Sequence, residues 1–150
     1  IGELLLKKKD NGSLNKNHIL SFLRQIFTNV RIKNLVEIRG ADRPPEGFEI
    51  APAAFWTGLL MEKSIRENIL DTVSSWKRKD RVILNDAAFA LNTSQMGPSN
   101  KTYGYWISYF GELALKGLKK RKLGEEKLFQ NFFNVVMNDG PFSLQNQKYE

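Results

Sequence analysis

The sequence predicts an α+β fold that is mostly helical and contains at least one β-strand. In several stretches apolar residues lie three or four positions apart, the spacing that puts them on one face of a helix. Another stretch alternates with period two, which is typical of a half-buried strand. With 41% apolar residues, 3 Trp, 10 Phe and 4 Tyr, the 150-residue chain has enough apolar material for a hydrophobic core and is unlike a disordered chain.

Six helices are predicted from this helical spacing. They cover residues 18–27, 52–60, 64–76, 77–91, 103–122 and 124–137. Pro52 is tolerated in a first turn, and Ser64 with Glu67 has the spacing of a capping box. The residues expected to face inward include Ile65, Leu70, Trp106, Leu113, Leu118, Leu128, Phe129, Phe133 and Met137.

Polar or proline-containing segments separate the predicted helices. Residues 10–17 are expected to form a flexible loop. Residues 92–102, which contain a Gly-Pro pair, are expected to form a long loop of the kind that often binds ligands or acts as a lid. Consecutive prolines in residues 43–47 exclude both helix and strand pairing there. At 150 residues one domain is expected, and no internal repeat is present.

The alternating stretch runs over residues 31–39 and is predicted to be a single strand. One face carries Val30, Ile32, Val36 and Ile38, and the other carries Arg31, Lys33, Leu35, Glu37 and Arg39. Glu37 and Arg39 lie roughly 7 Å apart along such a strand, close enough to serve one ligand. Gly40 and Asp42 then end it in a turn. Because one strand cannot satisfy its own backbone groups, its partners are either poorly patterned or missing from this chain, and we favour the second.

Charge and composition exclude several classes of site. The net charge of +7 and isoelectric point near 9.7 predict affinity for polyanions, whether nucleic acid, nucleotide phosphates or acidic membranes. The absence of cysteine excludes disulfides, thiolate catalysis and cysteine-ligated metals. His18 is the only histidine, which excludes a histidine-based metal site, and we expect it to be exposed at a helix start. No membrane span or signal peptide is recognisable.

Other charged residues have ordinary explanations. The five basic residues within residues 116–122 suit a helix C-terminus, where cations complement the helix dipole. A phosphate- or RNA-binding patch is the alternative, although the exposed aromatics that single-strand binders use for stacking are missing there. Asp71, Asp80 and Asp86 lack metal-ligand spacing and are interpreted as solvated.

Glu37 and Arg39 admit two interpretations. The pattern alone favours an ordinary solvent-facing strand with a weak ion pair. The other interpretation is phosphoryl chemistry, because a carboxylate is a suitable ligand for Mg²⁺ and a guanidinium binds phosphate oxygens through two hydrogen bonds.

The second interpretation is strengthened by a family resemblance. Residues 26–42, IFTNVRIKNLVEIRGAD, followed by residues 53–60, AAFWTGLL, resemble the C-terminal part of glutamate–cysteine ligases of the plant and bacterial branch. The strand of that branch reads roughly F-P-E-V-R-L-K-x-Y-L-E-M-R-G-A-D. The similarity extends more weakly into the later helices, so the resemblance makes residues 1–150 the C-terminal part of a single ligase catalytic domain whose N-terminal part is absent.

The resemblance implies a fold and a reaction. The fold is a glutamine-synthetase-like antiparallel sheet to which this segment contributes at least one strand. The reaction uses ATP and Mg²⁺ to convert the γ-carboxylate of glutamate into an acyl phosphate, which the amine of cysteine attacks, as in the first step of glutathione biosynthesis. By motif position, Glu37 matches an Mg²⁺ ligand and Arg39 an arginine that contacts the transferring phosphate, with Gly40 and Asp42 bracing the turn.

Several positions depart from the family pattern. Relatives have proline at Thr28 and a histidine near Phe22, and a plant cysteine aligns near Ile50, where this chain has no thiol. The plant Gly-Gly-Pro-Trp segment is replaced by Arg43-Pro-Pro-Glu46, which leaves the acceptor amine open because that tryptophan shapes the cysteine pocket. Arg31, Arg43 and Glu46 are weaker candidates for the substrate pocket.

The prediction is therefore a segment of a cytoplasmic, ATP-binding, magnesium-dependent ligase, inactive by itself. Its substrates are expected to be glutamate and an amine, with cysteine the first choice, and neither nucleic acid nor a membrane is expected as a partner. The alternative is a basic helical domain that binds RNA or protein and has no catalytic activity. The oligomeric state is left open.

Overall fold

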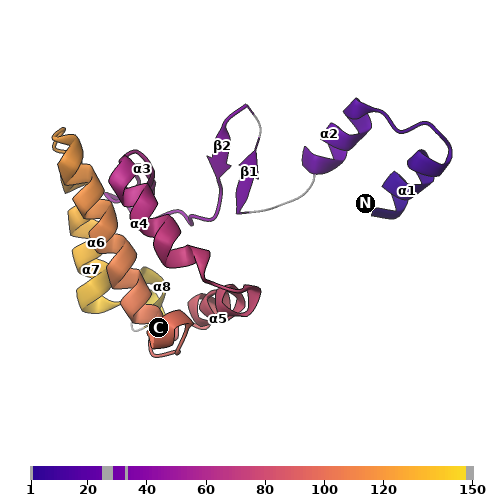
Figure 1. The fold of residues 1–150 in the computed structure, drawn as a ribbon. Helices are drawn as coiled ribbons and strands as arrows, with labels where there is room; N and C mark the ends of the chain where they lie inside the picture. Colours follow the sequence, from indigo (N-terminus) through magenta and orange to yellow (C-terminus); the bar gives the residue numbers. More distant parts are fainter. Residues whose placement is uncertain (1, 25–28, 33, 148–150) are drawn as a thin grey trace. The chain divides into compact units, whose positions relative to one another are not determined.

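The computed structural model describes residues 2–24, 29–32 and 34–147. It divides the chain into two compact units, residues 1–42 and residues 43–150, which are treated separately (Figure 1). Helices dominate and two short strands form one antiparallel sheet, so the predicted α+β class is confirmed. Thr28, Lys33 and the last three residues of the helix predicted over 18–27 lie outside the described residues.

The first unit contains two helices followed by two strands. Helix α1 covers Gly2–Asp10 and was not predicted, and α2 covers Lys16–Arg24. Strand β1 is Val30–Ile32 and β2 is Val36–Ile38. The Asn15 side chain accepts a hydrogen bond from the backbone of His18 at 3.0 Å and so caps α2. His18 is near the helix start, as expected, but it is half-buried, with Nε2 3.3 Å from Lys8 Nζ.

Apart from one isolated bridge, the regular elements among the described residues of the second unit are helices. Its helices are α3 (Ala51–Leu60), α4 (Lys63–Ser74), α5 (Arg78–Phe89), α6 (Tyr103–Arg121), α7 (Lys127–Asp139) and α8 (Phe142–Gln147), with a short 3₁₀ turn, η1, at Pro98–Asn100. Five of these correspond to predicted helices, and α8 was not predicted. None of the described helices is both long enough and apolar enough to cross a membrane.

The helix starts differ in how they are capped. The Thr102 hydroxyl accepts a hydrogen bond from the Tyr105 N–H at 3.1 Å at the start of α6. Asp80 accepts one from the Lys77 N–H at 2.8 Å at the start of α5, a capping role that its interpretation as a solvated residue did not foresee. The predicted capping box at Ser64 is also wrong. Helix α4 begins one residue earlier without a side-chain cap, and the Ser64 hydroxyl instead accepts from Lys120 Nζ at 2.7 Å.

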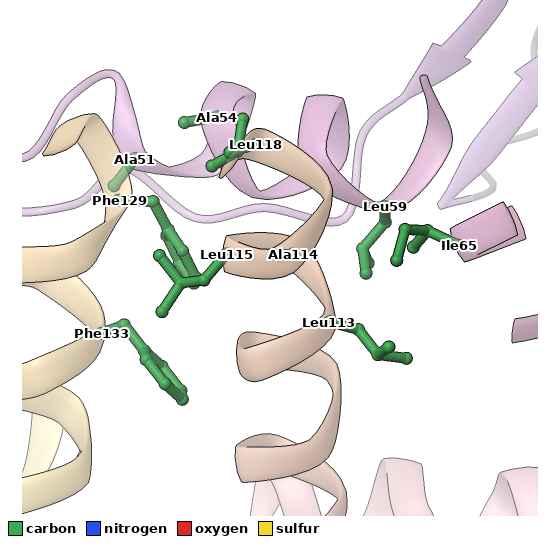
Figure 2. Close-up of a cluster of buried hydrophobic side chains, with 10 residues drawn as sticks. All are labelled: Ala51, Ala54, Leu59, Ile65, Leu113, Ala114, Leu115, Leu118, Phe129 and Phe133. Carbon is green, nitrogen blue, oxygen red and sulfur yellow. The ribbon is translucent and has the colours of Figure 1, made fainter. Parts of the chain in front are cut away.

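The core of this unit lies between α3, α6 and α7. Figure 2 shows its buried side chains converging from these three helices, with Ile65 of α4 beside Leu59 of α3. Its members are Ala51, Ala54, Leu59, Ile65, Leu113, Ala114, Leu115, Leu118, Phe129 and Phe133. Leu118 and Ala114 are completely buried. The inward-facing stripe predicted for α6 is therefore confirmed.

Close backbone contact between α3 and α6 depends on glycine. A Cβ atom built on Gly117 would overlap the carbonyl oxygen of Gly58, and one built on Gly58 would overlap the carbonyl of Ala114. A third glycine, Gly111, accommodates the ring of Phe133 from α7. The helix axes can approach this closely only because these positions carry no side chain.

Three residues predicted to face the core do not. Leu70 of α4 is 62% exposed, Leu128 of α7 50% and Met137 of α7 44%. Helical spacing identifies an apolar stripe, but the stripes of α4 and α7 are wider than the surfaces that their neighbours cover. On α4, Ile65 alone among the described residues is fully buried.

The segment between α5 and α6 is held by backbone hydrogen bonds. Met96 and Thr102 form an isolated antiparallel bridge. The Gly97 N–H donates to the Lys101 carbonyl and the Tyr103 N–H to the Gln95 carbonyl, both at 2.8 Å. This segment is therefore a closed turn that leads into α6.

Candidate metal–phosphate site

The candidate site begins with the β1–β2 hairpin. Its two strands are antiparallel, with Arg31 opposite Glu37 and Val30 opposite Ile38. The Arg39 N–H continues the pairing by donating to the Asn29 carbonyl at 2.7 Å. The prediction of one strand over residues 31–39 was therefore wrong, and its pairing partner lies within the same stretch of chain.

A period-two pattern could not distinguish these two arrangements. Residues that face each other across an antiparallel pair share one side of the sheet. In this register the partners are an even number of positions apart, as with Arg31 and Glu37. A hairpin with this register keeps the same alternation as one long strand, so the predicted common face was right although the strand was not.

The hairpin brings Arg31 against Glu37. Arg31 Nε donates to Glu37 Oε2 at 2.8 Å and Nη2 donates to Oε1 at 3.1 Å. In one extended strand these residues would be about 20 Å apart. The side chains are 21% and 33% exposed, so this two-point pair is shielded better than an ordinary surface ion pair. Both residues stand out in the alternating pattern, but nothing in the sequence pairs them, because only the hairpin makes them neighbours.

The remaining motif residues of the first unit follow β2 directly. Arg39 is half-buried, and Gly40 and Asp42 are exposed in a segment without regular structure. Arg39 comes two residues after Glu37, so alternation along an extended chain places both side chains on the same face. This end of the hairpin carries a carboxylate and guanidinium groups, the chemistry needed to bind a metal-bound phosphate.

Two weaker candidates belong to the second unit. Arg43 and Glu46 are both exposed and precede α3, with Pro44 half-buried between them. Because the two units are described separately, the structure does not relate these side chains to Glu37 or Arg39.

Glu37 has the right chemistry for one ligand of Mg²⁺. This ion prefers oxygen ligands and is usually bound by only one or two protein carboxylates together with phosphate oxygens and water. In the part of the chain that the structure describes, no group of three or more His, Asp or Glu side chains is close enough to hold a metal ion. Glu37 therefore fits the role of one ligand, while the described residues alone do not enclose an ion.

The C-terminal half of α6, in the second unit, carries a basic surface. Lys116, Lys119 and Lys120 line an open groove of about 590 Å³ together with Glu112 and Leu115. Arg121 pairs with Glu125, Nε to Oε2 at 2.6 Å, and this hydrogen bond raises the pKa of the guanidinium. These residues are at the C-terminal end of α6, where the helix dipole favours cations, as the simpler interpretation predicted.

Comparison with known proteins gives a consistent result. Residues 8–99 match the family model described as glutamate–cysteine ligase family 2. A chloroplastic glutamate–cysteine ligase of Brassica juncea is 35% identical over 71 residues, and that of Arabidopsis thaliana 37% over 71 residues. Chloroplastic glutamate–cysteine ligase A of Oryza sativa subsp. indica is 38% identical over 69 residues. The aligned segments cover 46–47% of this chain but only 13% of each relative.

Proposed function

Because this chain belongs to glutamate–cysteine ligase family 2, we propose that it forms part of the catalytic domain of an ATP- and Mg²⁺-dependent ligase that joins glutamate to an amine, with cysteine the first candidate. The γ-carboxylate of glutamate would attack the terminal phosphorus of ATP, releasing ADP and forming an acyl phosphate. The amine nitrogen would then attack the acyl carbon, and phosphate would leave as the amine loses a proton.

The observation that carries the proposal is the hairpin with its charged end. Glu37 is oriented by Arg31 on the neighbouring strand, and Arg39 follows two residues later. We assign to the Glu37 carboxylate the binding of Mg²⁺, which when bound would neutralise charge on the phosphates of ATP. We assign to the Arg39 guanidinium the binding of the transferring phosphoryl group, since arginine stays charged and makes two-point contacts with phosphate oxygens.

The rest of the site is assigned to parts of the ligase outside these residues. A two-stranded hairpin is at best marginally stable alone, so we propose that β1 and β2 join a larger antiparallel sheet of the glutamine-synthetase type. The 13% coverage of the relatives leaves ample chain for that sheet and for the other metal ligands. On this proposal the 150 residues alone are inactive. A cytoplasmic location and a place in glutathione biosynthesis stay predictions.

The test is ADP release by the protein encoded by the complete gene, with ATP, glutamate, Mg²⁺ and a panel of amines that includes cysteine. We expect turnover that needs glutamate and Mg²⁺ and that differs among the amines. Glu37→Gln should lower kcat by about 100-fold or more, because it removes a negatively charged metal ligand while preserving size.

Glu3→Gln is the matched control, since Glu3 is an exposed carboxylate in the same unit. It should leave kcat within a factor of two of wild type, since Glu3 is exposed and is not one of the motif residues. Absence of turnover with every amine would refute the ligase assignment. Full activity in Glu37→Gln would remove Glu37 from the metal site.

A further inference from the structure

We propose that Arg31 determines which metal ion the site accepts, by restricting Glu37 to binding the ion through one oxygen. This restriction suits Mg²⁺ and disfavours Ca²⁺. The inference rests on the proposed function, because it requires Glu37 to be a metal ligand, and it adds a role for a residue that does not itself touch the ion. Arg31 is thus a positioning residue.

The pairing of the two strands fixes this arrangement. Arg31 and Glu37 are directly opposite each other in the antiparallel register. Two guanidinium nitrogens of Arg31 engage both oxygens of Glu37: Nε donates to Oε2 at 2.8 Å and Nη2 donates to Oε1 at 3.1 Å, with Nη2 also 2.8 Å from Oε2. A two-point contact of this kind fixes the plane of the carboxylate as well as its position. The pair is largely shielded from solvent, with 21% and 33% of the side chains exposed, which strengthens it.

The two hydrogen bonds limit how a metal ion can approach Glu37. A carboxylate has about four lone-pair positions, two on each oxygen. The Arg31 guanidinium occupies the position on each oxygen that faces it, and a metal ion chelated by both oxygens would need these same two positions. A cation that binds Glu37 alongside this pair therefore binds it through a single oxygen.

The two common divalent cations respond differently to this limit. Mg²⁺ requires near-octahedral geometry at 2.0–2.1 Å and keeps several waters, so one oxygen per carboxylate suits it. Ca²⁺ takes 6–8 oxygen ligands and often binds a carboxylate through both oxygens. Preventing two-oxygen binding at Glu37 therefore costs Ca²⁺ a ligand and costs Mg²⁺ nothing.

Two variants of the complete protein test this role. Arg31→Lys keeps the positive charge but cannot hold both oxygens, because its ammonium is a single point charge. Arg31→Gln keeps a donor and loses the charge. Binding is measured by Mn²⁺ electron paramagnetic resonance, with Mg²⁺ or Ca²⁺ added as the competitor. In both variants we expect the Ca²⁺ to Mg²⁺ ratio of apparent Kd values to fall by roughly tenfold, about the effect of one charge-assisted hydrogen bond.

A merely structural role for Arg31 would give a different result. A loosened hairpin would weaken the binding of both ions by the same factor and leave the ratio of their Kd values unchanged. An unchanged ratio in Arg31→Lys would overturn the inference. If Arg31→Gln does not fold, as judged by its thermal unfolding, Arg31→Lys alone decides. Glu37→Gln separates the two proposals. Mn²⁺ binding that persists in Glu37→Gln overturns the metal assignment itself, whereas its loss, with an unchanged ratio in Arg31→Lys, overturns only the role of Arg31.

Discussion

A chain that ends at residue 99 is expected to lose the folded structure of α3, α4 and α5, even though the family match lies entirely within residues 8–99. Six of the ten core residues come from α6 and α7: Leu113, Ala114, Leu115, Leu118, Phe129 and Phe133. Removing the three leucines and two phenylalanines among them forfeits about 10 kcal/mol of burial energy. That loss equals the whole stability of an ordinary domain. Circular dichroism during thermal unfolding should therefore show no cooperative transition for this unit.

A chain that ends at residue 141 is the matched control. It keeps α6 and α7 and removes residues 142–150, which include α8, the six-residue helix Phe142–Gln147. It should retain a cooperative transition at a somewhat lower Tm, because Phe142 packs on Phe48 and Phe132 at ring distances of 5.5 Å. A cooperative transition of equal size in both shortened chains would contradict the description of one core shared by α3, α6 and α7.

Gly117→Ala is expected to destabilise the second unit by about 3 kcal/mol, at the upper end of penalties for overpacking. In most helix interiors the same change stabilises, since alanine is the better helix former by up to about 1 kcal/mol. Here the sign reverses because the added methyl group would overlap the carbonyl oxygen of Gly58, which is backbone and cannot rotate away. Urea unfolding measured by circular dichroism would give the change in free energy of unfolding.

Lys116→Ala provides the comparison for this variant, because Lys116 is the neighbouring residue on the exposed side of α6. It should change the free energy of unfolding by about 0.5 kcal/mol or less. If Gly117→Ala were as stable as wild type, α3 and α6 would have to pass each other at a greater distance than the structure gives.

The helices were predictable where an apolar stripe coincides with a buried surface. The stripe of α6 identified Leu113, Ala114 and Leu118 correctly because both α3 and α7 cover that helix. Leu70 belongs to an equally regular stripe and is nevertheless exposed. Periodicity shows which face of a helix is apolar. Whether that face is buried depends on which other helices pack against it, and the local spacing of residues contains no information about this packing.

The candidate residues could be named from the sequence, whereas the contact between them could not. The alternation correctly put Arg31 and Glu37 on one face, and the family match agrees with the motif that singled out Glu37 and Arg39. The sequence between β1 and β2 contains no recognisable turn signal, because Asn34 is not followed by the glycine that is typical of tight hairpins. The contact between Arg31 and Glu37 depends on that turn and could not be foreseen.

The role of residues 43–46 in substrate binding likewise does not follow from the sequence. Arg43 and Glu46 begin and end the segment that departs from the plant pattern, and both are exposed here in a unit described separately from the hairpin. The identity of the acceptor amine therefore follows from the amine panel rather than from the geometry of this chain.

The central claim is that Glu37 is a metal ligand of an ATP-dependent ligase. The most direct measurement is a crystal structure of the complete protein with Mn²⁺ and a non-hydrolysable ATP analogue, in which anomalous scattering locates the metal. We predict a Mn²⁺ ion about 2 Å from a single oxygen of Glu37, the usual distance for a small divalent cation, with Arg39 against the terminal phosphate. Mn²⁺ and nucleotide bound together at a site that does not include Glu37 would contradict the claim.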